Sequence, residues 1–388
     1  MAVVLEEKGS GHSVWEVLTY LHQQGSAPRS QIARELELSK ASVTEAIRYL
    51  DAKGLVVPRK AIANGSGRGR QTIPIQVNPE AGLLLGVDQA GGSLMVVVLD
   101  MALKVQARFE FPQLPRRAET SETLVFDAVD AVLMGLGPDR AAVRAIGVAI
   151  PGLVVVPEGI VAYSSPFGWK DEPLKKTFET RYNLPTIVVN DVNAMLVSEV
   201  IGTPLVNSTV MLLYIGEGIG GALWTNHRLW SGSHFSSGEW GHTKVRENGR
   251  LCQCGGRGCL EAEYSLPAVV RRVGLRDAHL NSWTAMVDHQ NDDIVVRELG
   301  DLSEAVGQVV GSAVAFIDPE VVIIDGPVTV IPALVQQIAL AIRRGAFAYS
   351  MDRIAFRAGS QGKGATACGA ASVAAEAYLG HRIQILNH

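Results

Sequence analysis

The most reactive side chains of the sequence gather in one glycine-rich segment. His242, Cys252, Cys254 and Cys259 lie close together there, and the segment holds three of the four cysteines of the chain. One imidazole and three thiolates suit tetrahedral Zn²⁺, with bonds of about 2.0 to 2.3 Å. Four protein ligands leave no position for a reactive water, so the predicted role is structural. The spacing is not that of a common zinc finger, and ordinary reduced cysteines in a glycine-rich loop are the alternative.

A basic segment is the second candidate for chemistry. Residues 58–70, PRKAIANGSGRGR, contain Arg59, Lys60, Arg68 and Arg70 and no acidic residue. Residues 1–78 hold ten Lys or Arg against seven Asp or Glu, although the net charge of the whole chain is −4. A basic, glycine-rich loop on a small domain is typical of contact with nucleic-acid phosphates.

Three helices are expected before this basic loop. The apolar spacing predicts a helix over residues 13–25, Ser30 is placed to cap a second one, and Ser39 is placed to cap a third that ends at Gly54. In the third helix the apolar stripe leaves small and basic residues toward solvent, as in a helix that enters a DNA groove. Two strands around the basic tip would complete a winged helix-turn-helix over residues 1–78, and a small helical subdomain without DNA contact is the alternative.

The DNA contacts follow from this prediction. Ser42 and Arg48 are the candidates for base edges, and Thr44 shares their exposed face. Basic residues are expected on phosphate or in the minor groove: Lys40, Arg59, Arg68 and Arg70.

The remaining sequence, from residue 79 to residue 388, predicts a larger α/β domain. A chain of 388 residues exceeds one ordinary core, and 47% hydrophobic residues with 40 glycines describe a compact globular protein. Residues 83–101 form a strand, a glycine turn and a returning strand, and residues 210–226 repeat this plan. The repeat predicts a duplicated fold with a cleft between its halves. The sequence shows neither a signal peptide nor a long apolar run, so we expect a soluble, cytoplasmic protein without membrane contact.

The segment GEWGHTKVRENGRLCQCGGRGCLEAEYS closely resembles the signature of the ROK family of repressors and sugar kinases. Supporting motifs are IPG at 150–152, NDVNAMLVSE at 190–199, GEGIGGA at 216–222 and GAAS near 369–372. The resemblance spans residues 83–388 and implies an actin-like, ribonuclease-H-like fold of two lobes. It also implies a homodimer or a dimer of dimers, and zinc at the four residues named above.

The resemblance further implies a sugar site in the cleft. Carboxylates and amides on rigid loops recognise neighbouring hydroxyls by paired hydrogen bonds. The positions that match the family's sugar contacts are Asn190, Asp191, Glu239, His242 and Glu261. For Asn190 and Asp191 a simple strand-end turn is the alternative, and for the two glutamates a solvated loop face. One departure is the loop SSPFGW, in which Pro166 or Phe167 stands where the family carries an asparagine.

The phosphate side departs from the kinases of the family. Asp191 matches their general base, but Ala90 and Gly92 replace a glycine and a threonine of the first phosphate loop. Glu217 places a carboxylate in the second loop, and Pro327 removes a backbone donor. We therefore expect a sugar-responsive regulator of carbohydrate genes, most simply a repressor, without catalysis and with Asp191 as a vestigial base. Two alternatives are an active sugar kinase with a DNA-binding arm and a regulator that answers to a protein partner.

Overall fold

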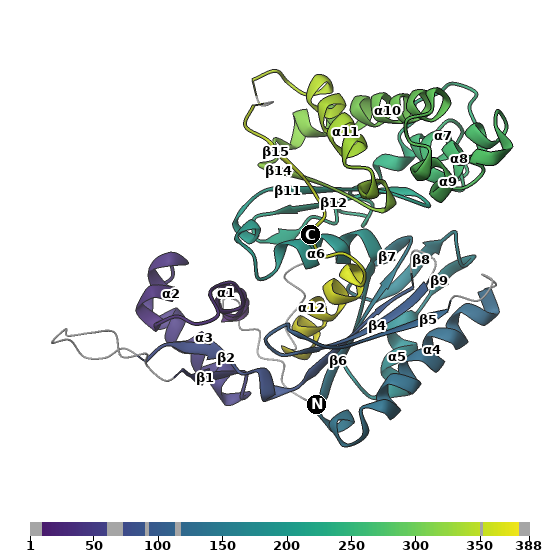
Figure 1. The fold of residues 1–388 in the computed structure, drawn as a ribbon. Helices are drawn as coiled ribbons and strands as arrows, with labels where there is room; N and C mark the ends of the chain where they lie inside the picture. The colour runs from purple at the N-terminus through teal and green to yellow at the C-terminus, as the bar shows by residue number, and fades with distance from the viewer. Residues whose placement is uncertain (1–9, 60–72, 90–92, 113–117, 350–351, 380–388) are drawn as a thin grey trace.

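The structure is a computed structural model that describes residues 10–59, 73–89, 93–112, 118–349 and 352–379. Its N-terminal part contains the helices α1 (Ser10–Gln24), α2 (Arg29–Glu35) and α3 (Lys40–Ala52). The strands β1 (Val56–Pro58) and β2 (Ile75–Val77) follow and pair in antiparallel fashion. This is a winged helix-turn-helix (Figure 1, purple), and the tip of its wing, residues 60–72, lies outside the described residues.

A side-chain cap explains where α3 begins, and a proline explains where α2 begins. The Ser39 hydroxyl accepts a hydrogen bond from the Ser42 backbone amide at 3.0 Å, as predicted. The predicted cap at Ser30 is wrong, because α2 begins one residue earlier, at Arg29. Pro28 precedes it with extended backbone and no side-chain cap. The fixed ring of proline favours that geometry just outside a helix, which the sequence prediction overlooked.

The first lobe is built on a five-stranded sheet. Its order is β10–β6–β3–β4–β5, from β3 (Leu83–Asp88), β4 (Ser93–Asp100), β5 (Val105–Pro112), β6 (Val143–Ile150) and β10 (Thr186–Asn190). The helices α4 (Ala118–Gly135) and α5 (Leu174–Tyr182) cover one face, and α12 (Ala365–Leu379) covers the other (Figure 1). A small sheet of β7 (Leu153–Val155), β8 (Ile160–Ser164) and β9 (Trp169–Glu172) adjoins β10.

The second lobe repeats the plan of the first sheet. Its order is β13–β12–β11–β14–β15, from β11 (Val210–Ile215), β12 (Ile219–Thr225), β13 (Arg228–Leu229), β14 (Val321–Asp325) and β15 (Ala355–Ala358). In both sheets an antiparallel hairpin is followed by parallel neighbours. The duplication that the sequence predicted is therefore present.

Helices lie on both faces of the second sheet. The helix α6 (Asp191–Val200) lies on the face toward the first lobe. The opposite face carries α7 (Leu260–Tyr264), α8 (Leu266–Gly274), α9 (Trp283–Asp288), α10 (Asp293–Ile317) and α11 (Pro332–Gly345) (Figure 1). Alternation along β11 fits this arrangement, because Val210 and Leu212 join the core of the first lobe while Met211 and Leu213 join the core under α10.

The helix α12 packs at backbone distance on its neighbours. A Cβ atom added at Gly147 would lie 1.9 Å from the Ala370 carbonyl oxygen, and one at Gly369 would lie 1.7 Å from that of Ala194 in α6. Only glycine permits contacts this close, so α12, the first sheet and α6 form one tightly fitted unit.

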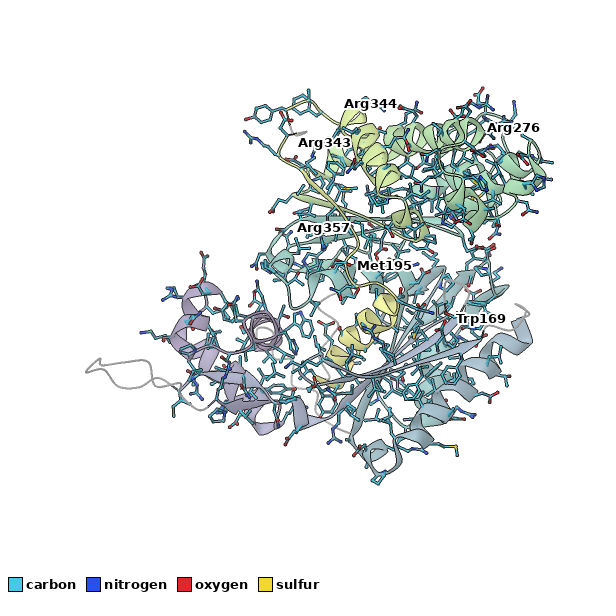
Figure 2. All side chains as sticks on the ribbon, in the orientation of Figure 1. Trp169, Met195, Arg276, Arg343, Arg344 and Arg357 are labelled. Carbon is cyan, nitrogen blue, oxygen red and sulfur yellow. The ribbon has the colours of Figure 1, made fainter. Side chains whose placement is uncertain are left out.

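A buried carboxylate joins α6 to the second lobe. Glu199, 1% exposed, accepts hydrogen bonds from Arg357 of β15 at 2.7 Å, from the Ser360 amide at 2.6 Å and from the Gln361 amide at 3.0 Å. Figure 2 shows Arg357 and Met195 of α6 where the two lobes meet. A buried charge needs such partners, and losing one of them would cost about 3 to 5 kcal/mol.

Side-chain hydrogen bonds join the winged helix to the first lobe. The Tyr49 hydroxyl of α3 donates to the Leu379 carbonyl at the end of α12, at 2.9 Å. The ring of His22 in α1 lies 3.0 Å, through Nε2, from the Met101 carbonyl after β4. None of the helices in the described ranges is both long enough and apolar enough to cross a membrane.

Candidate functional site

The predicted sugar contacts lie where elements of the two lobes end. Asn190 is the last residue of β10, and Asp191 begins α6. The Asn190 side chain caps α6 by accepting from the Asn193 amide at 3.0 Å, and it donates to the Gly152 carbonyl at 3.0 Å. Asn190 therefore has the strand-end role that was considered for it. Its side chain also holds the loop at Gly152 beside Asp191.

Burial dominates the electrostatics of Asp191. It raises the pKa of this carboxyl to about 6, against the partly opposing hydrogen bond from the Val192 amide at 2.9 Å. The negative charge of Glu239 contributes to the same rise. A carboxyl with a pKa near neutrality can accept or donate a hydrogen bond to a hydroxyl.

Glu239 and Glu261 come from the second lobe and face the same region. Glu239 precedes the short helix η4 (Trp240–His242), and Glu261 lies in the first turn of α7. Burial, together with the charge of Glu261, raises the pKa of Glu239, while His242 lowers it. The Glu261 carboxylate accepts from the Ile219 amide at 3.0 Å, so this side chain also holds the second glycine loop in place.

The four predicted metal ligands converge. The ligand atoms of His242, Cys252, Cys254 and Cys259 all lie within 4.8 Å of one another. His242 Nδ1 is 3.4 Å from Cys252 Sγ, and the sulfurs of Cys254 and Cys259 are 3.8 Å apart. A tetrahedral zinc ion separates its ligand atoms by about 3.3 to 3.8 Å, and a disulfide would need about 2 Å. The donor set and its spacing therefore fit a tetrahedral metal ion and do not fit a disulfide.

His242 connects this cluster to the carboxylates. Its Nδ1 faces Cys252, and its Nε2 lies 3.6 Å from the carboxylate of Glu239. A ring that binds metal through one nitrogen has its other nitrogen fixed in direction. A metal ion held in residues 242–259, the metal loop, would therefore orient a donor toward the predicted sugar contacts.

The metal loop also reaches across to the first lobe. Gln253, between two of the predicted ligands, accepts from Tyr163 Oη through its backbone carbonyl at 3.0 Å and from Ser165 Oγ through its side chain at 2.5 Å. Tyr163 and Ser165 lie in the β8–β9 region, beside Gly152, where a Cβ would meet the Tyr163 carbonyl at 2.3 Å. Sequence reasoning missed this bridge, because no local pattern shows which loops meet across two lobes.

The loop that departs from the family pattern has a packing role. Phe167 is 3% exposed and packs against Trp169 with ring centroids 4.9 Å apart and the ring planes tilted by 39°. The phenylalanine therefore completes the small sheet, and the polar side chain of this loop, Ser165, is directed to the metal loop.

The structure describes only part of the loops that would hold phosphate in a kinase of the family. Ala90 and Gly92 lie outside the described residues, and Glu217 is exposed in the second loop. Pro327 begins the short helix η6 (Pro327–Val330), at a position where a helix needs no amide donor. A separate open pocket lies between Trp240, Thr243 and Val245 on one side and Gln308 and Phe316 of α10 on the other. None of the five predicted sugar contacts lines it.

The predicted DNA contacts lie on the exposed face of α3 and on the wing. Lys40, Thr44, Arg48 and Arg59 are exposed, whereas Ser42 is half-buried. The Ser42 hydroxyl lies 2.8 Å from that of Ser39, and the Thr44 hydroxyl donates to the Lys40 carbonyl at 2.7 Å. Both hydroxyls are therefore engaged within the helix. Arg68 and Arg70 lie outside the described residues.

Two family models match this chain. The ROK family model covers residues 84–377, and the MarR family model covers residues 12–60. The fold and its site thus define a winged helix-turn-helix joined to an actin-like sugar-kinase fold. The chain belongs to the ROK family.

Relatives with curated names include repressors. A putative xylose repressor of Caldicellulosiruptor sp. (strain Rt8B.4) is 25% identical over 313 residues, 76% of this chain and 78% of that protein. The DNA-binding transcriptional dual regulator NagC of Escherichia coli (strain K12) is 25% identical over 325 residues, 81% of this chain and 80% of its own length.

Solved structures of regulators and kinases share the fold. A ROK family transcriptional regulator, a homologue of the E. coli MLC protein, matches 96% of this chain and 97% of its own with a TM-score of 0.79 at 22% identity. A ROK family glucokinase from Streptomyces griseus, in complex with glucose and AMPPNP, matches 76% of this chain and 99% of its own with a TM-score of 0.64 at 26% identity.

Replacing a predicted metal ligand tests the cluster. The Cys259→Ser variant should lose bound zinc, from about one ion per chain to a small fraction, and should unfold at lower temperature, because a structural metal stabilises the loop that holds it. Elemental analysis of the purified protein measures the metal. The Cys368→Ser variant, whose cysteine lies outside the cluster in α12, is the matched control. Full metal content in Cys259→Ser would contradict the assignment.

Replacing Asp191 tests the buried charge. The Asp191→Asn variant should gain about 2 to 3 kcal/mol in the free energy of unfolding near pH 7.5, because a pKa of about 6 in place of 3.8 means that the folded protein holds this charge at a cost. The contribution of protonated Asp191 to the free energy of unfolding is complete below about pH 4, and it is lost as the pH rises through about 6. The gain should therefore shrink by most of its size at pH 4.5.

Denaturant unfolding at the two pH values measures this difference. The exposed Asp139→Asn variant is the control and should show the same small effect at both. An equal gain for Asp191→Asn at both pH values would contradict the shifted pKa.

Proposed function

We propose that this chain is a sugar-responsive, DNA-binding transcriptional regulator, most simply a repressor of carbohydrate genes. The observation that carries the proposal is the contact between the winged helix-turn-helix and the ROK domain. The predicted recognition helix α3 contacts the last helix of the ROK domain, and that helix packs at backbone distance on α6, which begins at Asp191.

This contact supplies a physical route between the proposed sugar site and the predicted recognition helix. Besides the bond from Tyr49 to Leu379, the Lys53 ammonium lies 5.3 Å from the Tyr49 ring and 5.7 Å from the Tyr378 ring. The contact with Tyr378 joins the C-terminal end of α3 to the end of α12, and the contact with Tyr49 lies within α3. Sugar binding at Asn190, Asp191, Glu239, His242 and Glu261 would shift the relative position of the lobes, and α12 would carry the shift to α3.

The DNA-binding half of the proposal rests on α3 and the wing. Arg48, 80% exposed in its side chain, has only a loose ion pair with Glu45 at 3.9 Å and is free to reach a base edge. Ser42 and Thr44 have hydroxyls engaged in the helix, so we place them beside the phosphate backbone or a thymine methyl. Lys40, Arg59, Arg68 and Arg70 are proposed phosphate or minor-groove contacts.

A structural Zn²⁺ at His242, Cys252, Cys254 and Cys259 would serve this function. When bound, the ion would fix the loop that carries Gln253 and the direction of His242 Nε2. The chain's own residues then hold the two lobes at a defined distance, through Gln253 and its partners Tyr163 and Ser165.

Dimerisation would place two recognition helices on one palindromic operator. Exposed apolar side chains on α10 and α11, with Phe316 90% and Leu340 59% exposed, support a second copy of this chain as the partner. A dimer of dimers is a further assembly of the same kind. An operator-bound regulator of this type works in the bacterial cytoplasm.

The rival function is an active sugar kinase with a DNA-binding arm. It is favoured by the pKa of Asp191, which suits a general base, and by the likeness to a glucokinase. Against it stand Glu217, Ala90, Gly92 and Pro327 in the phosphate loops. Sugar-dependent release of ADP by the purified chain, abolished by Asp191→Asn, would favour the kinase over the regulator.

Sequencing of genomic fragments retained by the purified protein, with and without a mixture of sugars at a stated salt concentration, tests the regulator directly. A palindromic site beside carbohydrate genes, enriched in a sugar-dependent way, is the expected result. No enrichment would contradict the proposal, and enrichment indifferent to every sugar would favour a protein partner as the signal.

On the enriched site, Arg48→Ala should weaken binding by about 1 to 3 kcal/mol and relax the sequence preference at one base pair, because a bidentate contact to a base edge is lost. Arg59→Ala should instead weaken binding to all DNA sequences. It should also reduce the steepness of log affinity against log salt concentration by about 1. The Lys176→Ala variant removes the same charge from the exposed surface of α5, on the side of the first lobe away from the winged helix, and should change neither (Figure 1). Equal losses on specific and random DNA for Arg48→Ala would remove it from the base contacts.

A further inference from the structure

Arginines of the second lobe gather around a buried carboxylate. Glu263 of α7, 2% exposed, accepts from the Arg250 backbone amide at 2.6 Å, and its carboxylate lies 3.4 Å from Arg246 Nη1. Its backbone carbonyl accepts from Arg272 Nη1 of α8. Arg246 and Arg250 belong to the metal loop, so Glu263 brings arginines of the metal loop and of α8 together.

A second buried carboxylate takes up only part of this positive charge. Glu298 of α10 accepts from Arg272 Nε at 2.7 Å and from Arg276 Nη1. Arg271 is exposed in the last turn of α8, and its side chain has no ion pair within the described residues. Figure 2 shows Arg276 at the outer edge of the second lobe. Two buried carboxylates thus stand against five arginines, which we call the arginine cluster: Arg246, Arg250, Arg271, Arg272 and Arg276.

The acidic residues next to the cluster in sequence are not paired with it. Glu247 is exposed, and Asp277 accepts from the His279 backbone amide at 2.9 Å. Neither carboxylate is bonded to an arginine in the part of the chain that the structure describes. The arginine cluster therefore keeps a positive surplus.

Two guanidinium nitrogens of the cluster lack an acceptor. Arg250 Nη1 and Arg272 Nη2 are buried, and neither has a hydrogen-bond partner among the described residues. Buried donors of this kind are normally paired, because water no longer satisfies them. The dipole of α8 favours cations at its C-terminal end, which accounts for Arg271 and Arg272. It does not account for Arg250, which comes from another loop.

Like charges act on Arg250. Burial lowers the pKa of its guanidinium, the positive charges of Arg271, Arg272 and Arg246 lower it further, and Glu263 opposes them. An arginine stays protonated at every physiological pH, so the repulsion among these groups remains. A bound anion would relieve this repulsion and would supply the missing acceptors.

We propose that the arginine cluster binds a small phosphate-bearing anion, which goes beyond the proposed function because this ligand is neither the sugar nor the operator. A phosphate group carries a charge of about −1.5 to −2 at neutral pH and three strong acceptor oxygens. These oxygens point in different directions, so they can accept from the metal loop and from α8 together. None of the five predicted sugar contacts belongs to the cluster. In Figure 1 the helix α8 lies at the end of the second lobe remote from the winged helix, so operator phosphates do not reach the cluster.

Calorimetric titration of the full-length, zinc-loaded protein with inorganic phosphate tests the inference, at low ionic strength where exposed charges are least screened. We expect a dissociation constant below about 1 mM, and no binding of chloride at the same ionic strength. Glycerol 3-phosphate, with glycerol as its control, distinguishes the source of the phosphate group. Binding tighter than that of inorganic phosphate would support an ester as the ligand, and equal or weaker binding would support the free ion.

Two variants locate the bound anion. Arg271→Gln and Arg246→Gln should each weaken phosphate binding by about 5- to 10-fold, because each removes a charge-assisted hydrogen bond at a partly exposed site. Arg271→Gln breaks no ion pair of the described residues, so its fold should be unchanged. Arg140→Gln is the matched control: it removes the same charge from the exposed surface of η2 (Gly137–Ala142) in the first lobe, and the phosphate affinity should not change.

Zinc content and thermal unfolding without phosphate verify that each variant is folded. Absence of phosphate binding to the unaltered protein would overturn the inference. So would unaltered phosphate affinity in both Arg271→Gln and Arg246→Gln, because the anion would then lie elsewhere. Either result would leave the proposed regulator in place, since the arginine cluster includes neither the sugar contacts nor the DNA contacts.

Discussion

The contact of α12 with the first sheet and with α6 is the constraint on which the rest of the structure depends. Glycine at positions 86, 147 and 369 lets the backbones approach so closely that no side chain separates them. Interfaces packed in this way do not deform continuously, and they shift as units. The two ends of the unit matter for function: α6 begins at Asp191 in the proposed sugar site, and α12 ends at Tyr378 and Leu379 beneath the predicted recognition helix.

Charge is arranged around this unit in two different ways. Glu199, at the far end of α6, is buried and fully partnered by Arg357 and by backbone amides, so it holds the lobes together. Asp191, at the near end, is half-buried, and the pKa of its carboxyl is raised chiefly by burial, which marks an unfavourable charge. The predicted metal loop adds a third element, because Gln253 spans from it to Tyr163 and Ser165 of the opposite lobe.

Patterns within short segments predicted much of this architecture. The strands within residues 83–101 and 210–226 and the cap at Ser39 followed from residue types and spacing. The convergence of the four predicted metal ligands followed from their residue types together with the family resemblance. The start of α2 was wrong by one residue, because Pro28 sets the backbone there. Gln253 and Glu199 escaped prediction for a common reason: each acts through partners that are distant in the sequence.

The central claim is that sugar binding and operator binding are thermodynamically coupled in this protein. It is tested most directly by titrating the sugar into the protein alone and into the protein saturated with its operator. Linkage requires that the operator change the sugar affinity by the same factor by which the sugar changes the operator affinity, and we expect about 5- to 150-fold. Equal sugar affinities in the two titrations would contradict the account.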